Sequence, residues 1–183
     1  MTITDTQSVE TAGLTADLAC QHPTVQRTIV LSDLVGSTAI AATQGDDALL
    51  RILTRHDRIV ALNASAWGGT VVKSTGDGAM IVYERAPLAV SSAIHIQRQA
   101  QSVQMAVKVG VDHGPVVEYE CDYRGLIVNI ASRLADSATR GEILLTERAA
   151  QAASLPGPTR PRLLPGLDDR IRVRSLVVTR GEN

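Results

Sequence analysis

Two aspartates stand at the ends of predicted strands, where they could hold a cation together. Asp33 closes the apolar segment RTIVLSD (27–33), and Asp77 lies in the turn sequence TGDG (75–78) between two apolar runs. A pair of carboxylates with no neighbouring histidine or cysteine is a hard-oxygen donor set that suits Mg²⁺ together with phosphate oxygens. The residues alone leave simpler roles open, because Asp33 could cap the next helix and Asp77 could serve only the hairpin turn.

The elements that must position these carboxylates follow from hydrophobic periodicity and turn residues. In chain order the sequence predicts a strand (27–33), a helical region whose longer half opens at Gly45-Asp46 and stops at WGG (67–69), a hairpin (71–83), a helix (86–101), a strand (105–114) with a hairpin partner (115–120), a helix (125–138), a strand (142–146), a proline-rich loop (154–162) and a closing strand (171–178).

The order strand, helix, strand, strand, helix, strand is a split βαβ pattern. It predicts an α+β fold of the ferredoxin-like, palm type (βαββαβ), with an antiparallel-dominated sheet, helices on one face and added C-terminal strands. In such a sheet we expect the first strand and the first strand of the hairpin to be neighbours. That pairing would bring Asp33 and Asp77 together at one edge of the sheet.

Composition excludes several functional classes. A chain of 183 residues that is 44% hydrophobic can bury one core, which indicates one domain. A net charge of −1, 2% aromatic residues and no phenylalanine argue against a nucleic-acid-binding surface. No apolar run approaches the length of a membrane span. We expect residues 1–25 to be a flexible extension and residues 26–183 to form the domain.

Cysteine usage and the N-terminal sequence favour a cytoplasmic protein. Cys20 and Cys121 are the two cysteines, and their spacing forms neither a disulfide framework nor a zinc pattern. The segment MTITDTQSVE (1–10) lacks the basic and apolar regions of a signal peptide.

Three segments together resemble the class III nucleotidyl cyclase catalytic domain. They are VLSDLVGST (30–38), GGTVVKSTGDG (68–78) and YRGLIVNIASRLADSA (123–138), and the resemblance extends over residues 27–178. It implies that residues 26–183 form a cyclase catalytic domain. It further implies that Asp33 and Asp77, with the backbone of Leu34, hold two Mg²⁺ or Mn²⁺ ions.

The same resemblance assigns roles to side chains outside the metal site. Asn129 matches the ribose-orienting asparagine and Arg133 the arginine that stabilises the transition state. Their i,i+4 spacing places both on one face of the predicted helix, whereas Arg133 taken alone would be read as a solvated surface residue. The purine-selecting pair falls on Lys73 and Asp122. Lys73 offers a hydrogen-bond donor and Asp122 an acceptor. This pair complements adenine, whereas guanine would be left with unpaired polar groups.

The activity implied by the resemblance is conversion of ATP to 3′,5′-cyclic AMP and pyrophosphate. Two-metal catalysis would activate the ribose 3′-hydroxyl and hold the triphosphate. The resemblance also implies a head-to-tail homodimer, in which one chain supplies the aspartates and the other supplies the remaining site residues to each shared site. No nucleic-acid partner and no membrane span are expected.

Several alternative functions remain open, and the sequence departs from the family pattern in places. The alternatives are a catalytically silent nucleotide-binding domain, a cyclase with another nucleotide preference, and a palm-type enzyme that condenses two nucleotides, for which the expected GGDEF-like run is absent. Family guanylyl enzymes often have cysteine at the position of Asp122, and Cys121 lies one residue away from it. A lysine that reaches the terminal phosphates in some members has no match in LLPGLDD (163–169). Its possible substitutes are Arg162, Arg170 and Arg172.

Overall fold

The computed structural model describes residues 22–178. In chain order the elements are β1 (Thr24–Leu34), α1 (Ser37–Gln44), α2 (Asp46–Ala66), β2 (Thr70–Ser74), β3 (Gly78–Tyr83), α3 (Ala86–Ser102), β4 (Val107–Tyr119), β5 (Asp122–Arg124), α4 (Leu126–Ser137), β6 (Glu142–Thr146), α5 (Glu147–Ala152), β7 (Arg160–Leu163) and β8 (Arg170–Val177). Residues 1–21 of the extension predicted at 1–25 lie outside the described residues. Thr24 and Val25, at the end of that predicted extension, already belong to β1.

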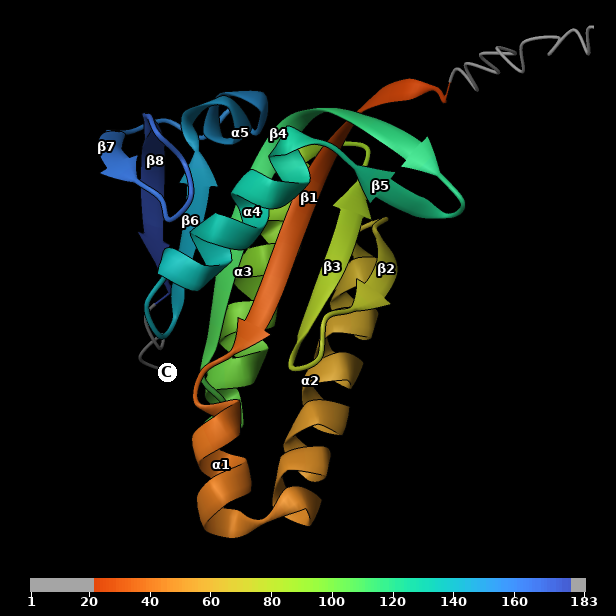
Figure 1. Cartoon of the computed structure of the whole chain (residues 1–183), viewed down its shortest axis with the longest axis vertical. Helices are drawn as coiled ribbons and strands as arrows, with labels where there is room; N and C mark the ends of the chain where they lie inside the picture. Colours follow the sequence, from red (N-terminus) through yellow and green to blue (C-terminus); the bar gives the residue numbers. More distant parts are fainter. Residues whose placement is uncertain (1–21, 179–183) are drawn as a thin grey trace, which may run out of the picture.

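The strands form one sheet in the order β2-β3-β1-β4-β6-β8-β7, with β5 paired to β4 (Figure 1). β1 pairs antiparallel with both β3 and β4, β2 pairs antiparallel with β3, and β4 runs parallel to β6. The order β2-β3-β1-β4 is that of a ferredoxin-like split βαβ sheet, with β6, β8 and β7 added beyond it. The predicted α+β fold class is confirmed.

The predicted neighbour of the first strand was wrong. β1 lies beside β3, the second strand of the hairpin, because β3 inserts between β1 and β2 as the split βαβ topology requires. The expected meeting of Asp33 and Asp77 still holds with β3 as the neighbour of β1. Asp33 pairs in register with Gly78, the residue after Asp77, so the turn of the hairpin still reaches the end of β1.

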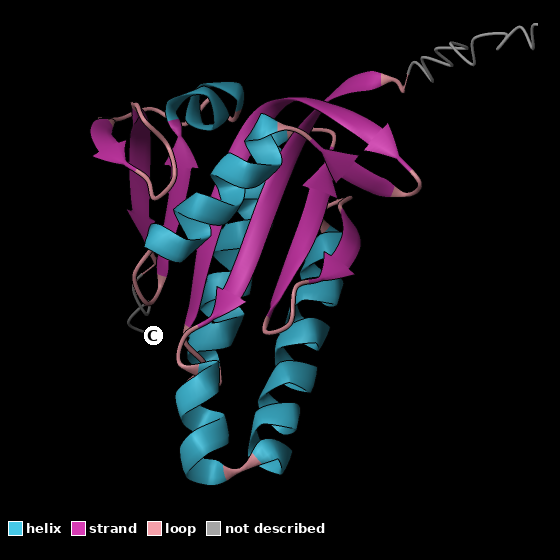
Figure 2. Ribbon diagram, viewed as in Figure 1, coloured by secondary structure: helices cyan, strands magenta, loops and turns pink. Residues whose placement is uncertain are grey.

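The helices cover both faces of the sheet, which corrects the expectation of helices on one face. α2 and α3 pack on one face, against a buried cluster that includes Val30, Ile81 and Val109. α4 crosses the other face and buries Ile127 and Ala131 against β1 and β3 (Figure 2). Strand side chains alternate between the two faces, so both faces of these strands are apolar.

Gly110 on β4 permits the close approach of α4. A Cβ atom at this position would lie 2.1 Å from the carbonyl oxygen of Ala131 and 2.5 Å from the amide nitrogen of Ala135. The α4 backbone therefore rests directly on β4, which fixes the helix over the centre of the sheet.

The hairpin predicted at 105–120 is a single strand. β4 runs without interruption from Val107 to Tyr119, and its hairpin partner is the short β5. Asp112 directly follows the apolar Val111 in an alternating segment, yet it is fully buried. Its carboxylate accepts hydrogen bonds from Thr146 Oγ1 (2.5 Å) and Arg148 Nε (2.8 Å). Because a buried carboxylate needs such partners, Arg148 makes its burial possible.

The remaining elements follow the sequence with two additions. The helical region after β1 divides at Gly45 into α1 and α2, as predicted. Helix α5 was not predicted; Thr146 caps it by accepting a hydrogen bond from the amide of Ala149. Strand β7, at the end of the predicted proline-rich loop, was not predicted either. Among the helices of residues 22–178, none has both the length and the apolar character that a membrane crossing requires.

Candidate active site

Backbone pairing brings Asp33 and Asp77 together. Asp33 lies opposite Gly78 in the β1–β3 register, and the amide of Leu34 donates to the carbonyl oxygen of Asp77 over 3.1 Å. The two carboxyl groups lie close enough that each shifts the pKa of the other. Gly78 is needed for this approach, because a Cβ atom there would lie 2.5 Å from the Ser32 carbonyl oxygen and 3.2 Å from Asp33 Oδ1.

Two further side chains hold these carboxylates in place. Ser37, the first residue of α1, donates a short hydrogen bond to Asp77 Oδ2. Lys108 lies opposite Asp33 in the β1–β4 register, and its Nζ lies 2.9 Å from Asp33 Oδ2. Both side chains of this ion pair are mostly buried, with exposed fractions of 20% for Lys108 and 26% for Asp33. The sequence analysis did not identify Ser37 or Lys108 as site residues.

The environment drives the pKa values of the two carboxyls apart. Burial raises the pKa of Asp33 above its ordinary value, and the neighbouring Asp77 adds to the rise, while Lys108 opposes it. Burial also acts to raise the pKa of Asp77, but the hydrogen bond from Ser37, the neighbouring Asp33 carboxyl, a backbone hydrogen bond and the charge of Lys108 together hold that pKa below its ordinary value. Adjacent carboxylates that resist simultaneous ionisation are a favourable site for a divalent cation, which removes the repulsion.

The donor set at this point fits a hard cation. Within residues 22–178 no cluster of three or more histidine, cysteine, aspartate or glutamate side chains is present, so a cation here would have two carboxylates as its side-chain ligands. Mg²⁺ and Mn²⁺ suit oxygen donors, and Mg²⁺ often takes one or two carboxylates while waters and substrate phosphates complete its shell. The pair formed by Asp33 and Asp77 matches that requirement.

A buried polar contact supports the end of β1 from the opposite face. Ser32 Oγ and His56 Nε2 lie 2.8 Å apart, and both residues are about 1% exposed. Burial lowers the pKa of His56, with the neighbouring Asp57 opposing the shift. A neutral imidazole from α2 is thus joined to the residue before Asp33. Its role could not be read from the sequence, because the pairing spans α2 and β1.

Lys73 and Asp122 meet within one chain. Lys73 Nζ lies 2.8 Å from Asp122 Oδ1 and 2.7 Å from Oδ2, joining β2 to β5. This ion pair, led by the hydrogen bond from Lys73, lowers the pKa of Asp122. Both side chains remain partly exposed, at 44% and 29%. The donor and the acceptor therefore lie side by side and within reach of a ligand.

Asn129 and Arg133 lie exposed on α4, one helical turn apart. Arg133 Nη1 lies 3.8 Å from Asp136 Oδ2, and Gly166 of the β7–β8 loop is close to its guanidinium. Within residues 22–178 no hydrogen bond or ion pair connects Asn129 or Arg133 to the two strand-end aspartates, or to Lys73 and Asp122. The structure thus brings together Asp33 with Asp77 and Lys73 with Asp122, but leaves the α4 pair separate from both.

Comparison with known proteins adds family membership to this geometry. The family model described as the adenylate and guanylate cyclase catalytic domain matches residues 20–158. An uncharacterized protein of Mycobacterium tuberculosis is 32% identical over 118 residues, which cover 63% of this chain and 31% of that protein. A Streptomyces coelicolor protein named adenylate cyclase is 28% identical over 122 residues, covering 66% of this chain and 32% of its own length. The chain thus spans about a third of the length of these curated relatives.

Solved structures agree on the fold. The adenylyl cyclase CyaB from P. aeruginosa superposes with a TM-score of 0.72 at 23% identity, covering 86% of this chain and 96% of that chain. The guanylyl cyclase Cya2 gives a TM-score of 0.75 at 19% identity, and the match covers 84% of this chain and 92% of that chain. Because one neighbour is named for each nucleotide, the likeness extends to the fold and does not choose between ATP and GTP.

Proposed function

Because this chain belongs to the adenylate and guanylate cyclase catalytic domain family, we propose that it is a metal-dependent adenylyl cyclase. It would convert ATP to 3′,5′-cyclic AMP and pyrophosphate in the cytoplasm, with residues 26–183 as the catalytic domain. The observation that carries the proposal is the meeting of Asp33 and Asp77, which the β1–β3 pairing brings together at the end of β1.

The metal role rests on the chemistry of this carboxylate pair. Asp33, Asp77 and the backbone of Leu34 would hold two Mg²⁺ or Mn²⁺ ions. Bound there, the cations would lower the pKa of the ribose 3′-hydroxyl and neutralise charge on the triphosphate. Ser37 keeps the Asp77 carboxylate in place through its hydrogen bond, and a ligand preorganised in this way reduces the cost of binding a cation. Lys108 occupies Asp33 in the absence of a cation, which would have to displace it.

The preference for ATP rests on Lys73 and Asp122. Adenine presents its amino group as a donor and N1 as an acceptor, and the pair offers one acceptor and one donor in return. Guanine presents the opposite pattern and would leave polar groups unpaired, which costs binding free energy. Lys73 and Asp122 already bind each other, so an incoming base must displace this ion pair before it can form its own hydrogen bonds with the two side chains.

Within residues 22–178 no hydrogen bond or ion pair joins Asn129 or Arg133 to the aspartates, which supports a site shared between two chains. In a two-fold homodimer, Asp33 and Asp77 of one chain would face Lys73, Asn129 and Arg133 of the other, together with Asp122. Symmetry would then create two equivalent sites. Asn129 would orient the ribose, and Arg133 would neutralise charge that develops on the α-phosphoryl oxygens.

Incubation of the purified chain with ATP, GTP, CTP and UTP in the presence of Mn²⁺, followed by mass analysis, tests the proposal. We expect cyclic AMP as the main product with wild type, and loss of turnover in D77N. Asn-Gly serves a tight turn as well as Asp-Gly does, so the hairpin should stay folded in this variant. Nucleotide binding without any product would instead identify a catalytically silent domain, and cyclic GMP as the main product would overturn the base assignment.

A further inference from the structure

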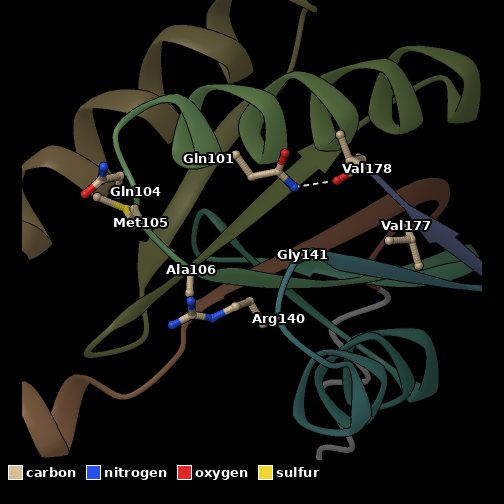
Figure 3. A pocket seen from close by; sticks show the side chains of 8 residues that line it. All are labelled: Gln101, Gln104, Met105, Ala106, Arg140, Gly141, Val177 and Val178. Atoms are coloured by element: carbon tan, nitrogen blue, oxygen red, sulfur yellow. Dashed lines mark hydrogen bonds between the residues drawn. The ribbon is translucent and has the colours of Figure 1, made fainter. Parts of the chain in front are cut away.

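Two adjoining cavities are lined by none of the side chains assigned to the candidate active site. One cavity of about 330 Å³ is formed by the segment after β1, by α1 and α2, by the loop between α3 and β4, and by Arg140. A neighbouring cavity of about 470 Å³ shares Gln104, Met105, Ala106 and Arg140 with it. Figure 3 shows the Arg140 side chain reaching toward Ala106, on the side where Gln104 and Met105 lie. Cavities of these sizes are typical of sites for small organic molecules.

Three arginines give the 330 Å³ cavity a concentrated positive charge. Arg51 and Arg55 lie four residues apart on α2 and therefore project from one face of the helix. Arg140 approaches from the segment between α4 and β6. No aspartate or glutamate lines this cavity. Within residues 22–178 no hydrogen bond or ion pair engages any of the three guanidinium groups, although the chain as a whole carries a net charge of −1.

The remainder of the cavity wall is largely apolar. Leu34, Ile40, Ile52 and Met105 line it beside the arginines. A guanidinium presents a fork of donors that matches carboxylate and phosphate oxygens, whereas an aliphatic wall favours a hydrocarbon. The combination selects a molecule with an anionic head and an apolar body over either a free inorganic anion or a neutral apolar compound.

We propose that this cavity is a second ligand site, which binds a small amphipathic anion: a carboxylate or phosphate head on an apolar chain or ring. The cavity adjoins the segment that carries the candidate metal site, because Leu34 and Val35 form part of its wall. Leu34 and Val35 follow Asp33 in the chain, and the amide of Val35 donates to the carbonyl oxygen of Ala106 over 2.9 Å, so both walls are tied to the end of β1. A bound anion would contact the segment that carries a candidate metal ligand without contacting the nucleotide-binding side chains.

Isothermal titration calorimetry of the full chain with octyl phosphate and with octanoate tests this site. Inorganic phosphate supplies the charge without the apolar chain, and octanol supplies the chain without the charge. We expect both amphipathic anions to bind more tightly than either control. In the double variant R55Q/R140Q the affinity should fall about tenfold or more, because each charge-assisted hydrogen bond to an anion contributes substantially. The matched control R58Q removes an exposed arginine of α2 that does not line the cavity.

Each result decides for or against the site. Tight binding of octyl phosphate or octanoate that R55Q/R140Q weakens and R58Q leaves unchanged supports it, and the stronger of the two ligands identifies the head group. Equal affinity for inorganic phosphate, equal affinity for octanol, no binding of either anion, or equal weakening by R58Q each overturns it. If sedimentation shows that R55Q/R140Q abolishes self-association, the surface is an interface between copies of the chain and the proposal is wrong. The measurement uses no nucleotide, so it stands or falls independently of the cyclase proposal.

Discussion

If a cation binds Asp33 as proposed, Lys108 would compete with it, and removal of Lys108 should tighten metal binding. Its ammonium group lies 2.9 Å from Asp33 Oδ2, and both side chains are about three-quarters or more buried. A cation at this carboxylate must displace that contact and then bear the repulsion of a nearby positive charge. The substitution K108Q removes both effects while keeping a side chain of similar length.

The magnitude follows from the burial of this pair. Exposed ion pairs contribute about 0.2–1 kcal/mol, whereas breaking a fully buried pair costs about 3–5 kcal/mol. The pair of Lys108 and Asp33 lies between these limits, so K108Q should lower the free energy of unfolding of the metal-free protein by about 1–3 kcal/mol. A competing interaction of about 1–2 kcal/mol corresponds to Mn²⁺ binding that is roughly 5 to 30 times tighter in K108Q.

Two measurements check this prediction. Electron paramagnetic resonance of free Mn²⁺ gives the affinity without nucleotide, and urea unfolding in EDTA or in excess MnCl₂ gives the stability with and without the ion. We expect Mn²⁺ to restore the stability that K108Q loses. The matched control is K73Q, which removes the chain's other lysine from the partly exposed pair with Asp122. Mn²⁺ binding that is unchanged or weaker in K108Q, or equally tightened in K73Q, would refute the reasoning.

Three further predictions concern assembly, base choice and pH. Mixing inactive D33A with inactive R133A at equal amounts should recover roughly a quarter of wild-type cyclase activity, because half of the dimers are mixed and each has one intact site; no recovery despite demonstrated subunit exchange would place each site within one chain. The double variant K73E/D122C should lower the ratio of ATP to GTP turnover by about ten- to hundredfold, and an unchanged ratio would remove the purine assignment. Since burial lowers the pKa of His56, the unfolded chain binds more protons than the folded one, so the free energy of unfolding should fall as pH drops below about 6.5, and urea titrations should show a smaller fall in H56Q.

The sequence predicted the elements well wherever a local pattern determines them. The helical stripe of α2, the proline in the first turn of α3 and the turn residues before Gly78 all depend on neighbours in the chain. The expectation that the β2–β3 turn meets the end of β1 came from the split βαβ order of the elements, and it was right. The reason given was wrong, because which hairpin strand pairs with β1 is decided by the topology of the whole sheet.

The features that the sequence did not predict are set by partners that are distant in the chain. Asp112 reads as an outward-facing residue of an alternating strand, but Thr146 of β6 and Arg148 of α5 make its burial possible. Lys108 reads as an ordinary polar residue of β4, and only the β1–β4 register places it opposite Asp33. A single sequence contains no signal for such pairings, since each depends on which strands come together.

The two halves of the candidate site differ in what positions them. Asp33 and Asp77 are fixed by paired backbone in one chain, where a register shift of a single residue would turn Asp33 to the other face of the sheet. Asn129 and Arg133 are fixed only by their spacing on the exposed side of α4. Under the proposed function, one chain therefore carries a preformed cation site but reaches the transition state only when a second chain supplies the α4 pair. Metal binding would then depend on the fold alone, whereas turnover would depend on association as well.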